Sequence, residues 1–183
     1  MRIITGRAKG LRLKTPTGLS TRPTTDRIKE SLFSILSGLT DFSGVDVLDI
    51  FAGTGALGLE AMSRGAATAT FIDSATTRII GDNIARAKFE ACRNLRGDFG
   101  KLLRRLAREG AAFDLIFSDP PYSRGLAQAS LDLVAELGLL KVGGLMIIEQ
   151  GAAETLDLPT GFELIRAEIY GRTTAIKILG VAT

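Results

Sequence analysis

The sequence predicts an α/β protein built on a mostly parallel sheet of seven strands, with helices on both of its faces. From about residue 45 almost to the end, short apolar runs alternate with segments whose apolar residues recur at helical spacing. This alternation is typical of parallel strands joined by crossover helices. Two β-rich runs, 162–170 and 173–179, flank Gly171 and Arg172 and predict a C-terminal antiparallel hairpin.

The individual elements follow from the same patterns. We expect strands near 45–49, 68–72, 91–95, 113–117 and 144–149. We expect helices near 56–65, 75–88, 98–108 and 124–137. Before them, alternating apolar and basic residues predict a small β-hairpin within residues 2–14, and a helix is expected from about residue 26 to 37. The chain therefore divides into an N-terminal extension, residues 1–40, and a main domain, residues 41–183.

Composition excludes several kinds of site. The chain has 183 residues, 45% of them apolar, which is enough for one substantial core. It has no histidine and one cysteine, Cys92, so an internal disulfide and a cysteine-cluster zinc site are excluded and we expect no metal. No apolar run is long enough for a membrane span, and the N-terminus lacks a signal-peptide core, so we expect a cytoplasmic protein.

Basic residues gather at the N-terminus. Residues 1–30 carry eight lysines and arginines against two acidic residues, a charge of +6, while the whole chain has +3. A basic segment on a mildly acidic body favours a polyanionic partner, because phosphate neutralisation supplies much of nucleic-acid affinity. The candidate RNA contacts are Arg2, Arg7, Lys9, Arg12, Arg22 and Arg27.

A second basic group shares one face of the helix expected at 98–108. It consists of Lys101, Arg104, Arg105 and Arg108. A solvated helix face is the favoured interpretation, and contact with RNA stays open.

A glycine-rich loop follows the first strand of the main domain. Gly53, Gly55 and Gly58 have the spacing G-x-G-x-x-G directly before a helix, and Asp73 lies 20 positions beyond Gly53. Glycines at this place let the backbone turn tightly beside a ligand, and an acidic residue after the second strand can accept hydrogen bonds from a ribose. The pattern predicts a nucleoside cofactor but fits NAD as well as S-adenosylmethionine.

Three details favour S-adenosylmethionine. Asp49 precedes the loop, where a carboxylate can hold an amino-acid ammonium group, which NAD lacks. Asp98 and Phe99 follow the third strand and offer an acceptor and an apolar ring to an adenine. The third detail is a polar turn after the fourth strand, at the sheet edge where open α/β sheets bind ligands.

That turn is Asp119-Pro120-Pro121-Tyr122. Two prolines fix φ at two positions and remove two N–H donors, so the carbonyls and the Asp119 carboxylate stay available as acceptors. A planar substrate with an exocyclic amine suits this arrangement, because the amine donates to the acceptors while its ring stacks on Tyr122. By itself the motif is equally compatible with a proline-stiffened loop.

The ordered set 49–58, Asp73 and 119–122 resembles a class I S-adenosylmethionine-dependent methyltransferase with a Rossmann-like fold. The segments Arg2-Ile3-Ile4-Thr5-Gly6 and Thr21-Arg22-Pro23-Thr24-Thr25-Asp26-Arg27 narrow the resemblance to the RsmD-type bacterial guanine-N2 methyltransferases of 16S ribosomal RNA. Thr5 departs from this pattern, in which a second glycine is expected.

The resemblance implies a role for each motif. It implies S-adenosylmethionine as cofactor, with the methionine part at Asp49 and the loop glycines, the ribose at Asp73 and the adenine at Asp98 and Phe99. The full set of implied cofactor-binding residues is Asp49, Phe51, Gly53, Gly55, Asp73, Ser74, Asp98 and Phe99. Asp119, Pro120, Pro121 and Tyr122 would hold the guanine for in-line methyl transfer. Residues 1–40 would contact the RNA and residues 41–183 would bind the cofactor.

The implied partner is ribosomal RNA or the small ribosomal subunit, and we expect a monomer. Several alternatives stay open: methylation of adenine N6 in DNA, methylation of a glutamine amide in a protein, a ribosome-assembly factor that binds RNA without chemistry, and an NAD-dependent oxidoreductase. The basic N-terminus disfavours a protein substrate, and the Asp119–Tyr122 turn disfavours a pure binding protein.

Overall fold

A computed structural model describes residues 1–16, 23–122 and 124–182, and the side chains of residues 23–25 are not described. Within these residues one sheet holds seven strands in the order β3-β2-β1-β4-β5-β7-β6. Strands β1 to β5 pair in parallel, whereas β7 is antiparallel to both β5 and β6. This confirms the predicted α/β fold and its C-terminal antiparallel hairpin.

The elements lie close to their expected positions. The strands are β1 (Asp46–Ile50), β2 (Thr68–Asp73), β3 (Cys92–Arg96), β4 (Phe113–Ser118), β5 (Leu140–Gly151), β6 (Phe162–Tyr170) and β7 (Thr174–Val181). The helices are α1 (Pro23–Leu36), α2 (Ala56–Arg64), α3 (Thr77–Ala87), α4 (Phe99–Arg108) and α5 (Leu126–Glu136). Strand β5 begins earlier than expected, because Leu140 already pairs with Phe113 ahead of a register shift.

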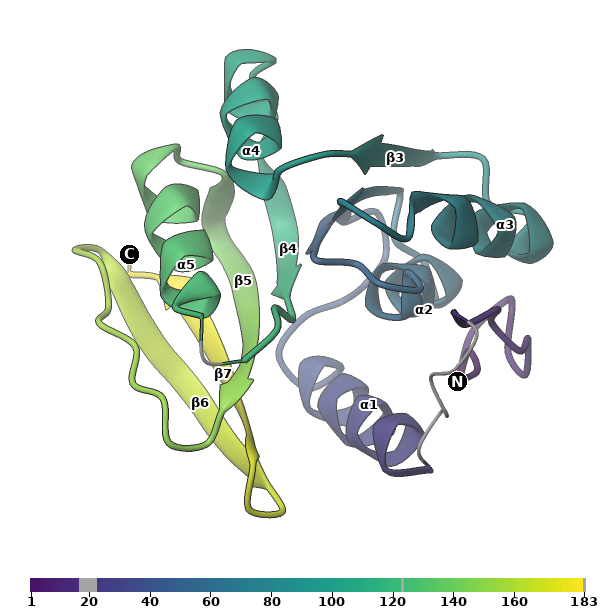
Figure 1. Cartoon of the computed structure of the whole chain (residues 1–183), viewed down its shortest axis with the longest axis horizontal. Helices are drawn as coiled ribbons and strands as arrows, with labels where there is room; N and C mark the ends of the chain where they lie inside the picture. The colour runs from purple at the N-terminus through teal and green to yellow at the C-terminus, as the bar shows by residue number, and fades with distance from the viewer. Residues whose placement is uncertain (17–22, 123, 183) are drawn as a thin grey trace.

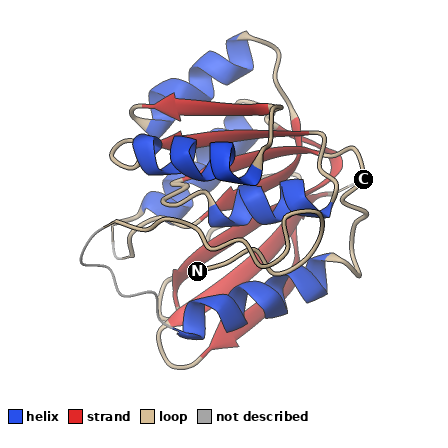
Figure 2. Ribbon diagram, turned by 90° about the vertical axis from the view of Figure 1, so that its right-hand side faces the viewer, coloured by secondary structure: helices blue, strands red, loops and turns tan. Residues whose placement is uncertain are grey.

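Helices cover both faces of the sheet, and each face has its own apolar core (Figures 1 and 2). Successive strand residues point to opposite faces, so Val47 packs with α1, α2 and α3 while its neighbour Leu48 packs with α4 and α5. The sheet is thereby buried on both sides, as its nearly continuous apolar strands require.

The N-terminal β-hairpin is reduced to one β-bridge, between Arg2 and Arg12. Ile3 N–H donates to the Leu11 carbonyl at 3.0 Å, but regular pairing does not continue. The backbone N–H groups of Ile4 and Thr5 donate instead to the Glu60 side chain of α2, at 2.7 and 3.0 Å. Long-range contacts with α2 thus replace the local ladder. The division at residue 40 stays a prediction.

The strand order reverses between β1 and β4, which lie side by side with Ile50 opposite Ser118. From β1 the chain continues toward β2 on one side, and from β4 it continues toward β5 on the other. Loops that leave such a switch point in opposite directions open a crevice between them. The glycine-rich loop and the Asp119–Tyr122 turn are the two loops that leave this point.

Candidate active site

A cavity of about 800 Å³ lies at the carboxyl ends of the central strands. The loop after β1, the start of the Asp119 turn, the end of β5, the β6–β7 hairpin, α1 and Met1 all contribute to its wall. Of the residues predicted from the sequence, Asp49, Phe51, Gly53, Asp119 and Arg27 line it. The cavity therefore joins the predicted cofactor loop to the predicted catalytic turn.

The glycine-rich loop adopts backbone conformations that few side chains tolerate. Phe51 has φ 61°, Gly53 has φ 57° and Gly55 has φ 77°. A left-handed phenylalanine costs free energy and is found mainly where the surroundings impose it, as at ligand sites. A Cβ atom added to Gly53 would approach only the Phe51 carbonyl, at 3.9 Å, so glycine leaves room beside the cavity. Gly55 instead lies at the N-terminus of α2.

Asp49 lines the cavity although it is only 1% exposed. Its Oδ2 accepts the Gly58 N–H of α2 at 2.9 Å. Burial raises the pKa of Asp49 to about 7, the Gly58 N–H acts in the opposite direction, and Asp73 raises it further. A positively charged group arriving at this point would favour the ionised carboxylate.

Asp73 organises the loop from the end of β2. Its carboxylate accepts the N–H groups of Gly53 at 3.0 Å, Ala75 at 2.7 Å and Thr76 at 2.8 Å. Burial acts to raise the pKa of Asp73, but these N–H donors outweigh burial and the pKa is lowered. Asp73 and the exposed Ser74 lie beside the cavity rather than in its wall.

Asp98 and Phe99 follow β3. Asp98 is the N-cap residue of α4, where its Oδ1 accepts the Lys101 N–H at 3.0 Å. The Phe99 ring packs on the Phe51 ring, with centroids 4.8 Å apart. Neither residue is part of the cavity wall, although Phe99 contacts Phe51, which is.

The Asp119 turn is directed toward the ends of β5 and β7. Asp119 lines the cavity with its side chain open to water, Pro120 is buried and Pro121 is exposed. The Tyr122 hydroxyl donates to Glu149 Oε1 at 2.5 Å and lies 3.1 Å from Thr174 Oγ1. These contacts fix the hydroxyl end of Tyr122, an arrangement not predicted from the sequence.

Carboxylates affect one another across this part of the cavity. The surrounding protein, then Glu149 and Asp49, raise the pKa of Asp119 well above its usual range, although water reaches the side chain and limits the effect of burial. Burial likewise raises the pKa of Glu149, against the Tyr122 hydrogen bond. Both acids therefore hold protons more readily than isolated carboxyl groups do.

Glu149 and Thr174 line the cavity and were not predicted as site residues. Glu149 ends the apolar run of β5, and an acid at that place can equally cap a strand. The distinguishing observation is spatial: β5 lies beside β4 with Ile148 opposite Ser118. Glu149 and Asp119, one residue beyond each partner, therefore lie side by side, with Asp119 just past the end of β4 and Glu149 near the end of β5.

Most of the described residues predicted to contact RNA lie outside the cavity wall. Arg2, Arg7, Lys9 and Arg12 are exposed on the N-terminal segment, whereas Arg27 is exposed and also lines the cavity. The Arg7 guanidinium lies 4.7 Å from the centroid of the Phe89 ring. Arg22 lies outside the described residues.

The basic face of α4 is engaged in part by surface ion pairs. Arg104 pairs with Glu136 and Arg105 with Glu109, each at 2.8 Å. None of the four basic residues lines the cavity. These observations agree with a solvated face.

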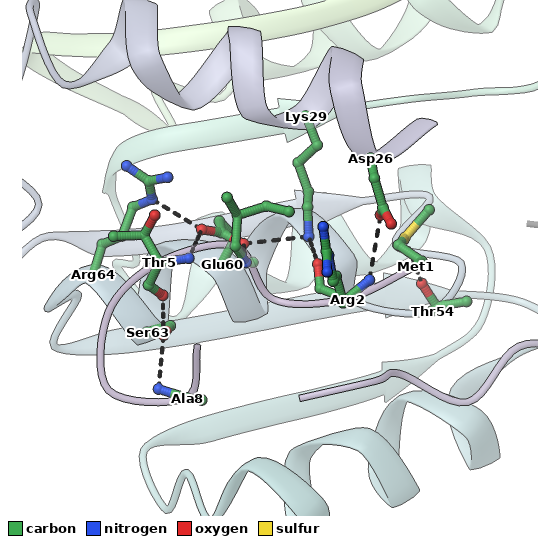
Figure 3. Close-up of polar contacts among 12 residues, drawn as sticks. Met1, Arg2, Thr5, Ala8, Asp26, Lys29, Thr54, Glu60, Ser63 and Arg64 are labelled. Carbon is green, nitrogen blue, oxygen red and sulfur yellow. Dashed lines mark hydrogen bonds and ion pairs between the residues drawn. The ribbon is translucent and has the colours of Figure 1, made fainter. Parts of the chain in front are cut away.

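Glu60 anchors the N-terminal segment to the main domain (Figure 3). It is fully buried, and besides the N–H groups of Ile4 and Thr5 it contacts Lys29 at 3.2 Å and Arg64 at 3.0 Å. Lys29 comes from α1 and also donates to the Arg2 carbonyl at 2.5 Å. Burial lowers the pKa of Lys29 although Glu60 opposes this effect. A glutamate on the otherwise apolar side of α2 is the sequence signal for this anchor.

The same segment reaches the glycine-rich loop. Thr54 Oγ1 donates to the Met1 sulfur at 3.6 Å, and Met1 lines the cavity. The buried Asn83 Nδ2 donates to the Thr54 carbonyl at 2.9 Å and to the Lys14 carbonyl at 3.1 Å. The basic N-terminal segment and the predicted cofactor loop are therefore bonded to a common residue.

Comparison with known proteins agrees with this geometry. A family model described as Conserved hypothetical protein 95 matches residues 1–178. Ribosomal RNA small subunit methyltransferase D of Escherichia coli strain K12 is 36% identical over 175 residues, which cover 94% of this chain and 86% of the relative. The chain belongs to the RsmD family.

The fold of this RsmD-family chain is also similar to that of solved structures. An Escherichia coli protein described as a methyltransferase has a TM-score of 0.87 and 34% identity to this RsmD-family chain, and the match covers 100% of this chain and 98% of the other. A protein described as a methyltransferase complexed with SAH shares the fold, with a TM-score of 0.68 and 16% identity over 86% of this chain and 49% of the other. The Rossmann-like methyltransferase fold expected from the sequence is confirmed.

The described part of this RsmD-family chain holds neither a candidate membrane span nor a metal-ligand cluster. Among residues 1–16, 23–122 and 124–182, no helix combines the length and apolar character of a bilayer span. In the same ranges no three histidine, cysteine, aspartate or glutamate side chains gather as metal ligands would.

Proposed function

We propose that this protein transfers a methyl group from S-adenosylmethionine to the exocyclic N2 of a guanine in small-subunit ribosomal RNA. The observation that carries the proposal is that Asp49 and Gly53 line the same cavity as Asp119. The names of the relatives support ribosomal RNA as the substrate class. Action on ribosomal RNA in turn favours a cytoplasmic location.

The loop side of the cavity fits the cofactor. Asp49 offers a buried carboxylate to the ammonium group of the methionine part, and Gly53 leaves room for the chain that follows. Asp73 holds the glycine-rich loop by accepting the Gly53 N–H, and it lies beside the loop on the side where a ribose would bind. When bound, S-adenosylmethionine would supply a methyl group on a sulfonium sulfur, and because the thioether is a good leaving group the transfer would need no strong base.

The Asp119 side of the cavity fits an aromatic amine. The lone pair of guanine N2 is delocalised into the ring, so the residues that accept its hydrogens also orient the lone pair. Asp119 and the Pro120 carbonyl take this role. The nitrogen–carbon bond would form as the carbon–sulfur bond of the cofactor breaks, and the methylated amine would then lose one proton. Asp119, whose pKa is raised, is suited to receive that proton.

The RNA would approach over the N-terminal segment. Arg27, at the cavity wall, is placed to contact the phosphate of the target nucleotide, while Arg2, Arg7, Lys9 and Arg12 contact neighbouring phosphates. These contacts would offset the cost of a few kcal/mol for taking a base out of its stack.

Replacing Asp119 tests the proposal. Asp119→Ala is expected to lower methyl transfer to small subunits or ribosomal RNA by about 10²- to 10⁴-fold, because the amine loses its acceptor. Binding of S-adenosylmethionine, measured by calorimetry, is expected to persist. Labelled S-adenosylmethionine and nucleoside analysis of the product provide the rate and identify the methylated atom.

Asp119→Asn is the matched control, since it keeps one acceptor oxygen and removes the ability to take a proton. Unaltered turnover by Asp119→Ala would refute the assignment of this residue. Label found only in adenine, in DNA or in protein would favour the corresponding alternative substrate, and cofactor binding without transfer would favour an assembly factor.

A further inference from the structure

A second carboxylate faces the cavity next to Asp119. Glu149 follows Ile148 in β5, and Ile148 is the parallel partner of Ser118, which precedes Asp119. Asp119, just past the end of β4, and Glu149, within β5, therefore lie side by side, and both line the cavity. Of these two carboxylates, the proposed methyl-transfer step uses only Asp119.

Glu149 is held in a fixed orientation. Its Oε1 accepts the Tyr122 hydroxyl at 2.5 Å, and the same hydroxyl lies 3.1 Å from Thr174 of β7. Three separate segments of the chain thus meet at the Tyr122 hydroxyl, which holds the half-buried Glu149 carboxylate. A charged group kept in this setting beside a second acid costs free energy unless hydrogen-bond donors reach both.

Guanine offers donors in the required arrangement. Its exocyclic N2 amine lies next to N1–H, so two donors stand side by side on one edge. Adenine and 2-aminopurine each place an amine next to a bare N1, which is an acceptor and would face a carboxylate unfavourably. Two neighbouring carboxylates therefore select an amine flanked by a second N–H.

We propose that Glu149 is a specificity-determining residue that accepts the N1–H of the target guanine while Asp119 accepts from its amine. This inference rests on the proposed function and adds how the base is distinguished. Tyr122 and Thr174 are positioning residues in this arrangement, because they act on the base through Glu149.

Replacing the acceptor with a donor tests the inference. In Glu149→Gln, the amide oxygen can still accept the Tyr122 hydroxyl and the amide N–H₂ faces the base. We compare kcat/KM for methyl transfer to ribosomal RNA that carries either guanine or 2-aminopurine at the position methylated by the wild-type protein. The two bases share the C2 amine and differ at N1 and O6, and the O6 difference is the same for every variant.

The wild-type protein is expected to prefer guanine. In Glu149→Gln, the ratio of guanine to 2-aminopurine activity is expected to fall about 10- to 100-fold, since one hydrogen bond to a charged group is removed and a matched donor is introduced. Glu149→Ala, which supplies no donor, is expected to lose guanine activity without gaining activity on 2-aminopurine.

Tyr122→Phe is the control for a purely structural role. It removes the hydroxyl that positions Glu149 but leaves the carboxylate, so the ratio of guanine to 2-aminopurine activity is expected to fall by less than in Glu149→Gln. If Glu149→Gln lowers both activities equally, Glu149 only anchors Tyr122 and the inference is overturned while guanine methylation stands. If the wild-type protein labels no guanine, the proposed function fails and the inference fails with it.

Discussion

Asp49 carries an ionisable carboxyl group although it is almost completely buried, and burial disfavours the charged form. One hydrogen bond from Gly58 offsets only part of the cost, and the pKa rises to about 7. A carboxylate kept under such conditions at the wall of a cavity is typical of ligand sites. An ammonium group would offset the cost, which is why Asp49 carries more weight for the cofactor assignment than the glycines beside it.

This burial predicts how stability changes with pH. Because the pKa of Asp49 is higher in the folded state than in the unfolded chain, the folded state binds the extra proton and its stability falls as pH rises from about 4 to 7. Between pH 5 and pH 8, the Asp49 carboxyl is expected to remove at most about 3 kcal/mol from the free energy of unfolding.

Urea unfolding of the wild-type protein and of Asp49→Asn at several pH values measures this contribution. The asparagine keeps an acceptor for the Gly58 N–H and cannot ionise, so the difference between the two proteins isolates the carboxyl group. Stability curves that run parallel over the whole pH range would contradict the prediction.

At the scale of elements, helix α2 lies unusually close to the sheet. A Cβ atom added to Gly58 would lie 2.5 Å from Cε1 of Phe71 in β2, which real contacts do not permit. This close approach brings the Gly58 N–H to Asp49 and the N-terminus of α2 to the cavity. Gly58 thus sets the distance on which the cofactor loop depends.

Two helix glycines form a matched pair for testing this distance. Gly58→Ala is expected to lower the free energy of unfolding by about 1–3 kcal/mol, because Phe71 or α2 must move. Gly81→Ala in α3, whose added Cβ meets only Asn94 Nδ2 at 3.5 Å, is expected to raise it by up to about 1 kcal/mol. Denaturant midpoints measure both, and a stabilised Gly58→Ala would show that α2 has room.

Strands and helices were predictable from the sequence where the local periodicity of apolar residues determines them. The apolar strands β1, β2 and β4 and the helices between them follow from local patterns, and the family resemblance supplied the order of the motifs. The N-terminal hairpin was predicted as more regular than it is, because its N–H groups bond to Glu60, 55 and 56 residues away. Glu149 is not among the predicted site residues for a related reason, since its partner Tyr122 lies on another segment of the chain.

At the scale of the whole molecule, charge is unevenly distributed along the chain. The first 30 residues carry +6 and the remainder −3. Among the described basic residues of this stretch, Lys29 is buried against Glu60 and the others are exposed. Arg27 extends the basic surface to the cavity wall. The RNA-binding surface would therefore be continuous with the entrance to the site.

Salt dependence tests this arrangement. Arg12→Gln and Lys9→Gln are each expected to weaken RNA binding and to reduce the slope of log K against log salt concentration by about 0.7–0.9 for every phosphate that the variant no longer neutralises. Arg93→Gln is the control with the same change of charge, because Arg93 lies on β3 and is already paired with Glu109. Fluorescence titrations at several salt concentrations measure the slopes, and equal reductions in all three variants would indicate a general charge effect instead.

The Glu60 anchor also bears on the order in which the chain becomes organised during synthesis. Ile4 is synthesised 56 residues before Glu60, whose carboxylate accepts its N–H. Lys29 likewise cannot form its ion pair until Glu60 has been synthesised. Until Glu60 and Arg64 have been made, the basic segment has no place to dock. The surface that we propose to bind RNA therefore acquires its final shape only after the first strand and the glycine-rich loop have been synthesised.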